Sequence, residues 1–182
     1  QYLVSTEKTE AIDICIRQLK IARNMTEESA ALRELVFSGS ARAKESKESL
    51  LLAFYQKWKS EPLVVDLWLG IQASCPLEGT LSKVKELMQH ESFDLKIPNR
   101  VRALISQFAS SNFVNFHNIS GDGYKFLGDR VAELNEINPQ IASRLMVPLT
   151  RWRKYDETRK DMMKRELARI LEIESLSSDV YE

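Results

Sequence analysis

Cysteine, histidine, glycine and proline are all scarce in this sequence of 182 residues. It contains two cysteines, two histidines, six glycines and five prolines. The cysteines, Cys15 and Cys75, stand in unrelated contexts, which excludes a disulfide framework and suits a reducing compartment. We therefore expect a cytoplasmic protein. So few glycines and prolines argue against a loop-rich or all-β chain.

A net charge and a long hydrophobic run are missing as well. Lys and Arg number 26, Asp and Glu also number 26, and the formal net charge is +0. No overall field therefore draws the chain to nucleic acid or to an anionic membrane. The longest apolar run, 62–71, is interrupted by Asp66 and falls far short of the ~20 residues of a membrane span. We expect neither a membrane nor a nucleic acid as partner.

The chain opens at Gln1 without an initiator methionine or the pattern of a signal peptide. Its first residues already read as the start of a helix. We expect residues 1–182 to form a single domain that was cut from a longer polypeptide.

What the sequence does contain is a series of amphipathic segments at helical spacing, with no alternating strand pattern. Thr26 is the expected N-cap of the second helix and Gly39 its C-terminal glycine, while Pro62 and Pro98 each begin a helix. The expected helices are 5–23, 26–37, 40–59, 62–73, 80–90, 98–109, 123–137, 138–148 and 155–173, with the start of one more in 175–182.

The spacing of these helices predicts the architecture. Their starts recur about every 15 to 25 residues, so two helices fit into the roughly 40 to 47 residues of a HEAT or armadillo unit. The predicted fold is all-α, a superhelical stack of antiparallel helix pairs forming a HEAT/armadillo-like solenoid. No consensus repeat is visible, so this prediction rests on helix length and short loops.

Two histidines allow metal sites and catalytic triads to be checked exhaustively. His90 and Glu91 begin like a zinc-binding His-Glu-x-x-His helix, but the fifth position is Asp94. We interpret His90 as part of a polar helix end. His117 has no nucleophile with a supporting acid beside it, so we favour a hydrogen-bonding role that fixes its loop over a general base. We expect no catalytic and no metal-binding residue in this chain.

Gly121-Asp122-Gly123 resembles a phosphate-binding loop only superficially. The further glycines and the Lys-Ser/Thr pair that hold nucleotide phosphates are missing. We predict a turn before a helix.

The segment 144–169 is rich in cations, with Trp152 and Tyr155 among them, as on a nucleic-acid-binding surface. Acidic residues alternate with these cations at helical spacing, which favours a salt-bridged solvent face. An RNA-binding helical repeat is the weaker hypothesis for this segment.

Arg102 and Arg144 differ from the other cations, because each lies at or beside the apolar side of its helix. A guanidinium there either forms an ion pair inside the solenoid or points into a wet concave channel, where it can bind a carboxylate. The sequence leaves both alternatives open.

Several phrases together resemble a known family. They are 53–58 (AFYQKW), 62–68 (PLVVDLW), 71–73 (IQA), 98–102 (PNRVR), 115–117 (NFH), 121–124 (GDGY), 138–144 (NPQIASR) and 153–156 (RKYD). With these, the sequence resembles the C-terminal helical domain of bacterial-type aminopeptidase N, over about 24–181. These zinc aminopeptidases remove N-terminal residues from peptides. One departure is 119–123, where relatives read closer to Glu-Asp-Gly-Ser-Gly, and it leaves the conformation of that loop open.

The resemblance implies a non-catalytic domain that closes over a catalytic domain of the same polypeptide and walls off an internal channel for peptide substrates. Zinc and the Gly-x-Met-Glu-Asn motif that holds the substrate amine would belong to upstream domains, so no cofactor is expected here. Arginines of this domain line the channel in relatives, and the matching positions are Arg102 and Arg144. The alternative is a free-standing HEAT-like scaffold that binds proteins along its concave face.

Overall fold

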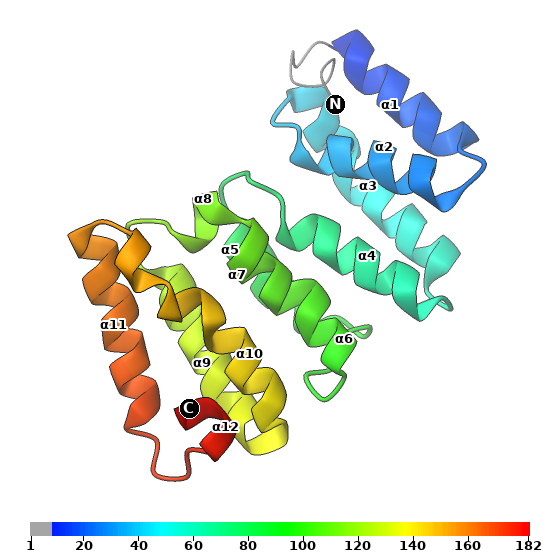
Figure 1. Cartoon of the computed structure of the whole chain (residues 1–182). Coiled ribbons are helices and arrows are strands. Elements are labelled where there is room, and N and C mark those ends of the chain that lie inside the picture. The colour runs from blue at the N-terminus through cyan, green and yellow to red at the C-terminus, as the bar shows by residue number, and fades with distance from the viewer. Residues whose placement is uncertain (1–8) are drawn as a thin grey trace.

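The helices of this chain follow one another in a curved row, from α1 at one end to α11 at the other (Figure 1). The computed structural model describes residues 9–182, which contain helices and loops and no strand. The first helices are α1 (Thr9–Ile21), α2 (Met25–Phe37), α3 (Ala41–Trp58), α4 (Pro62–Ala73) and α5 (Thr80–Leu87). The predicted all-α solenoid is confirmed.

A nearly continuous helix crosses the middle of the row. It consists of α6 (Pro98–Val101), the π-helical turn η2 (Arg102–Ser106) and α7 (Gln107–Ser111). The remaining elements are α8 (Phe113–Phe116), α9 (Asp122–Ile137), α10 (Pro139–Thr150), the 3₁₀ turn η3 (Trp152–Lys154), α11 (Glu157–Leu171) and α12 (Ser178–Tyr181). In residues 9–182 no helix combines the length and the apolar character needed to cross a bilayer.

One layer of apolar side chains runs along the row from α2 to α12 and holds the helices together. A smaller cluster at the first end joins α1 to α2 and α3 through Ile12, Cys15, Leu35 and Ala43. Burial of this kind contributes roughly 25 cal/mol per Å² of apolar surface, so the stack is stabilised mainly by contacts between neighbouring helices.

The helix that begins at Pro98 buries the face predicted for it. Val101, Leu104, Ile105 and Phe108 are all fully buried. The sequence predicted a regular α-helix here, but the N–H of Gln107 donates to the carbonyl of Arg102, five residues back. The wider turn lies where α4 approaches closely: a Cβ at Gly70 would be 3.4 Å from the Ala103 carbonyl oxygen.

Several helix boundaries differ from the prediction. The predicted Ser5–Lys8 part of the first helix lies outside the described residues. The N-cap of α2 is Asn24, not Thr26, and its side chain accepts a hydrogen bond from the N–H of Glu27. An amide oxygen in extended backbone caps as well as a hydroxyl, and the cap lies two residues before the predicted one. Gly39 is not the C-terminal glycine that was predicted. The helix ends at Phe37, its C-cap Ser38 is extended, and Gly39 does not have a left-handed conformation.

Three further segments differ from the prediction in length or in order. The fifth helix ends at Leu87 instead of 90, and the expected loop 110–122 contains the short helix α8. The helix begun at Pro139 continues two residues past Pro148, to Thr150. Pro148 has no N–H to donate, and the chain leaves the α-helical path soon after it.

Buried asparagine side chains tie elements that are distant in sequence. The Asn112 amide donates to the carbonyl oxygens of Ala73 (3.0 Å), the last residue of α4, and of Cys75 (2.6 Å) in the loop after it. Asn135 in α9 donates to the carbonyl of Ser175 and accepts from the N–H of Ser177. These bonds satisfy loop carbonyls and amides that would otherwise be buried without partners.

Candidate functional site

Two segments that flank the same cavity carry cations and no carboxylate. Residues 98–121, which include α6, η2 and α7, contain no Asp or Glu, and neither do residues 138–155, which include α10 and η3. Since the whole chain is neutral, this surface is locally positive.

The two arginines of the first segment have different environments. Arg100 forms a partly buried ion pair with Asp66, and its side chain also donates to the carbonyls of Ser92 (2.8 Å) and Pro62 (2.9 Å). Arg102 is exposed, and its Nη2 donates to Oδ1 of Asn99 at 2.6 Å. The structural ion pair considered for Arg102 is therefore made by Arg100.

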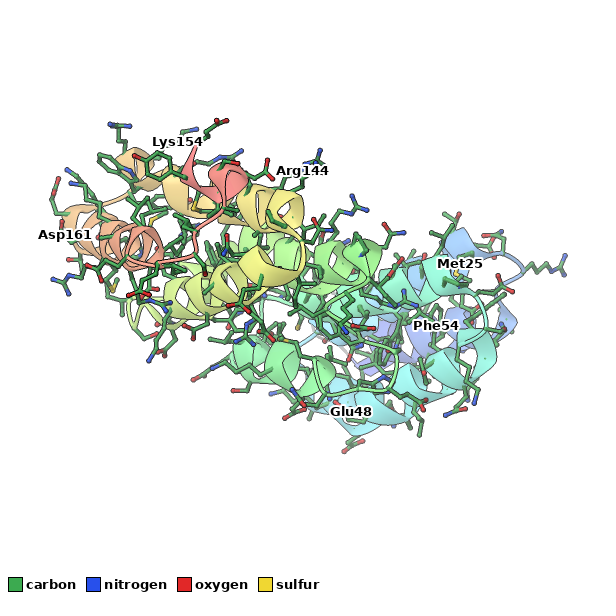
Figure 2. All side chains as sticks on the ribbon, turned by 90° about the horizontal axis from the view of Figure 1, so that it is seen from below. Met25, Glu48, Phe54, Arg144, Lys154 and Asp161 are labelled. Atoms are coloured by element: carbon green, nitrogen blue, oxygen red, sulfur yellow. The ribbon has the colours of Figure 1, made fainter. Side chains whose placement is uncertain are left out.

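Arg144 lies on α10 and is exposed to solvent. Figure 2 shows it on the same edge of the molecule as Lys154, with Glu48 on the opposite edge. Within residues 9–182 neither Arg144 nor Arg102 takes part in an ion pair. Each guanidinium carries five N–H donors, of which Arg102 uses one for Asn99, so both groups can bind a ligand.

A shallow cavity of about 160 Å³ lies between the two segments. Arg144, Arg151 and the hydroxyls of Ser106 and Ser110 supply its polar wall, while Leu145, Val147 and Pro148 supply an apolar wall. Arg102 does not line it but precedes Ser106 by four residues on the same helix. The cavity can hold a carboxylate with an aliphatic group beside it.

Sequence reasoning selected Arg102 and Arg144 but did not select Arg151 as a site residue. Arg151 was assigned to a salt-bridged face together with the cations of α11. The missed signal is the acid-free stretch 138–155, which leaves Arg151 without a carboxylate nearby in sequence.

His117 is held between two tyrosines. Its Nδ1 lies 2.9 Å from the Tyr124 hydroxyl and its Nε2 lies 2.8 Å from the Tyr155 hydroxyl. A neutral imidazole offers one donor and one acceptor, so one hydroxyl donates and the other accepts. The backbone carbonyl of His117 accepts a hydrogen bond from Nε of Arg159 at 2.7 Å. The predicted loop-fixing role is confirmed.

The buried position of His117 also determines its charge. Desolvation, helped by the positive charge of Arg159, lowers the pKa of His117 from 6.5 to about 4. The same desolvation raises the pKa of Tyr124 to about 12. His117 and Tyr124 are therefore both neutral at pH 7.

The loop beside His117 is the turn predicted at Gly121-Asp122-Gly123. Gly121 adopts a left-handed conformation (φ 75) and precedes α9. A Cβ at Gly123 would collide with the carbonyl of Phe116, so only glycine lets α8 and α9 approach this closely.

His90 lies in the turn after α5. Its Nδ1 contacts the Ser92 hydroxyl at 2.8 Å and accepts from the N–H of Ser92, while its ring packs against Tyr55 and Trp68. Among residues 9–182 no group of three or more His, Cys, Asp or Glu side chains is placed to hold a metal ion.

Known proteins resemble this chain over almost its whole length. Residues 1–182 match the family described as "Domain of unknown function (DUF3458_C) ARM repeats". Aminopeptidase N of Haemophilus influenzae is 43% identical over 161 residues, which are 88% of this chain and 18% of the relative. Aminopeptidase N of Escherichia coli is 39% identical over 176 residues, 96% of this chain and 20% of the relative.

A solved structure is similar as well. The crystal structure of Legionella pneumophila aminopeptidase A in complex with aspartic acid superposes with a TM-score of 0.86 and 36% sequence identity. The match covers 94% of this chain and 20% of that one. The chain thus spans about a fifth of the length of the relatives it matches.

Proposed function

Because this chain belongs to the DUF3458_C family of ARM-repeat domains, we propose that it is the C-terminal helical domain of a zinc aminopeptidase that removes N-terminal residues from peptides. The observation that carries the proposal is the match of nearly the whole chain to about a fifth of aminopeptidase N. Catalysis and zinc binding then belong to other domains of the same polypeptide.

In this proposal the domain closes over the catalytic domain and lines an internal channel. The support is the positive surface around the shallow cavity, where Arg102 and Arg144 are exposed and not engaged by carboxylates of residues 9–182. A free guanidinium beside an apolar wall complements the C-terminal carboxylate of a peptide whose N-terminus is at the catalytic centre.

We also place the protein in the cytoplasm. Both cysteines are buried free thiols, as is usual in a reducing compartment.

The first experiment compares the parent protein with this chain on alanyl and leucyl fluorogenic substrates, with and without a zinc chelator. The proposal expects activity in the parent, loss of it with the chelator, and none in the isolated chain. An inactive parent, or a parent no longer than this chain, would refute it and favour a free-standing scaffold that binds proteins.

A second experiment tests the channel. In the parent, Arg144→Ala and Arg102→Ala should each lower kcat/KM by about tenfold for tetrapeptides with a free carboxylate, since a charge-assisted hydrogen bond is lost. Amino-acid fluorogenic substrates, which do not reach these residues, should be unaffected. Lys85→Ala, which removes an exposed cation from α5, is the matched control. Equal losses on both substrate types would contradict the channel role.

A further inference from the structure

Cations gather around Trp152 in η3, at the edge of the cavity. Cζ of Arg153 lies 4.2 Å from the centre of the Trp152 ring and Nζ of Lys164 lies 4.5 Å from it. Nζ of Lys160 is 6.0 Å away but is also paired with Glu157 at 2.9 Å. The indole thus holds two side chains from different elements, η3 and α11, in place.

Three carboxylates in the segment that follows this tryptophan pair with cations of the same segment. Asp156 pairs with Arg159, Glu157 with Lys160 and Glu166 with Arg169. Figure 2 shows Asp161 at the end of the molecule, apart from Lys154 and Arg144. Four cations in η3, beside it and on α11 form no ion pair with the described residues 9–182, and we refer to them together with Trp152 as the basic patch: Arg151, Arg153, Lys154 and Lys164.

The basic patch is continuous with the cavity, because Arg151 belongs to both. A ligand whose carboxylate lies at Arg144 could place further groups along Arg151, Arg153 and Lys154. Side chains already held on an aromatic ring lose less conformational freedom on binding than free ones, which favours binding there.

We propose that the basic patch binds acidic side chains of peptides, so that this domain selects peptides with Asp or Glu downstream of their N-terminal residue. The biological source of such peptides rests on the proposed function; the binding itself is a property of this chain. Guanidinium groups bind carboxylates through paired hydrogen bonds, and a locally positive surface on a neutral chain attracts anionic ligands over a short range only.

The geometry favours a peptide over a nucleic acid. Trp152 is half-buried and its ring already contacts Arg153 and Lys164, which compete with a base for stacking on it. After η3 the cations are also interleaved with carboxylates, beginning with those of Asp156 and Glu157. A long polyanion would meet these carboxylates, whereas a short acidic peptide would not.

The test measures binding of two fluorescent hexapeptides to this chain by fluorescence anisotropy at low and physiological salt. Both end in an amide; one has Asp and Glu at positions three to six, and the other has Asn and Gln there. We expect the acidic peptide to bind at least about tenfold more tightly, with an affinity that falls as salt rises.

Two triple variants with the same change in net charge locate the binding. Arg151→Gln, Arg153→Gln and Lys154→Gln together should lose the acidic preference. Lys59→Gln, Lys85→Gln and Lys96→Gln, at exposed positions on other elements, should retain it. All six residues are exposed, so both variants should fold, which circular dichroism checks.

Equal binding of the two peptides, or equal loss in both triple variants, would overturn the inference. So would tighter binding of a single-stranded RNA of equal charge, which would assign the basic patch to nucleic acid. The proposed function fails separately, because it depends on the activity of the parent and its response to peptide length. If the parent shows this activity and this response to peptide length, but the chain binds the two peptides equally, only the proposed acidic preference is overturned.

Discussion

The Nε2 atom of His117 lies 2.8 Å from the hydroxyl of Tyr155, although the two residues are 38 positions apart. This contact joins the loop before α9 to the loop before α11. It thereby sets the position of η3 and of the cations around Trp152.

Removing that hydroxyl should weaken the domain without disturbing its shape. Tyr155→Phe leaves Nε2 of a nearly buried imidazole without a partner, which costs about 1–2 kcal/mol. Urea unfolding measures the loss. Tyr181→Phe, at a position that is 72% exposed, should change the stability little. A Tyr155→Phe protein as stable as the control would show that the hydrogen bond contributes nothing.

The lowered pKa of His117 predicts how stability depends on pH. The unfolded chain binds a proton near pH 6.5, whereas the folded chain binds it only near pH 4. Between these values the unfolded state holds more protons, so stability rises with pH through this window and is complete above about pH 6.5. Stability should fall as pH decreases from 6.5 toward 4, by at most about 3 kcal/mol.

Denaturant unfolding at pH 7, 5.5 and 4.5 measures this dependence. His117→Gln removes the titrating group and should flatten the profile between pH 7 and 4.5, since most carboxylates still stay ionised there. Identical slopes in the two proteins would assign the pH dependence to other groups.

Arg100 and Arg102 stand on either side of Val101 and should respond differently to removal. Arg100→Ala leaves the Asp66 carboxylate, whose side chain is 16% exposed, without its partner, and should cost about 3 kcal/mol of stability. Arg102→Ala should stay within about 0.5 kcal/mol of the unchanged protein. Thermal unfolding of the two variants measures this difference in stability. A large loss of stability in Arg102→Ala would mean that Arg102 has a structural role.

Two glycines should tolerate a methyl group to different degrees. At Gly79 an added Cβ meets nothing within 4 Å, so Gly79→Ala carries only the strain of its left-handed backbone (φ 86), about 1 kcal/mol. Gly123→Ala forces α9 away from the Phe116 backbone and should cost at least about 2 kcal/mol. Equal unfolding midpoints would contradict the close approach of α8 and α9.

Local signals in the sequence predict much of the fold. The helix Pro62–Ala73 is predicted with its observed ends, because Pro62 begins it and Cys75-Pro76 follows it. The cap of α2 is less predictable, since Asn24 and Thr26 both suit the position and only the backbone conformation selects between them. The π turn at Arg102 depends on the approach of α4, which no local pattern contains.

The site was predicted only in part, because local signals mark some of its residues and contacts between distant segments determine the others. Arg102 and Arg144 stand out because each lies next to apolar neighbours on its own helix. The role of Arg100 depends on Asp66, 34 residues away, and the cavity at Arg151 forms only when α10 packs beside α7. The resemblance to aminopeptidase N is confirmed by the relatives, whereas the channel role of the arginines stays a prediction.

The asparagine ties described in the fold have a consequence for synthesis on the ribosome. Asn112 bonds to carbonyls 37 and 39 residues before it, and Asn135 to groups 40 and 42 residues after it. The Ala73 and Cys75 carbonyls in the first tie, and the Asn135 side chain in the second, therefore leave the exit tunnel before the groups that pair with them have been translated. The nascent chain is completed from its N-terminal end in steps, and a pause in translation after Cys75 would leave that loop without its partner Asn112 for as long as the pause lasts.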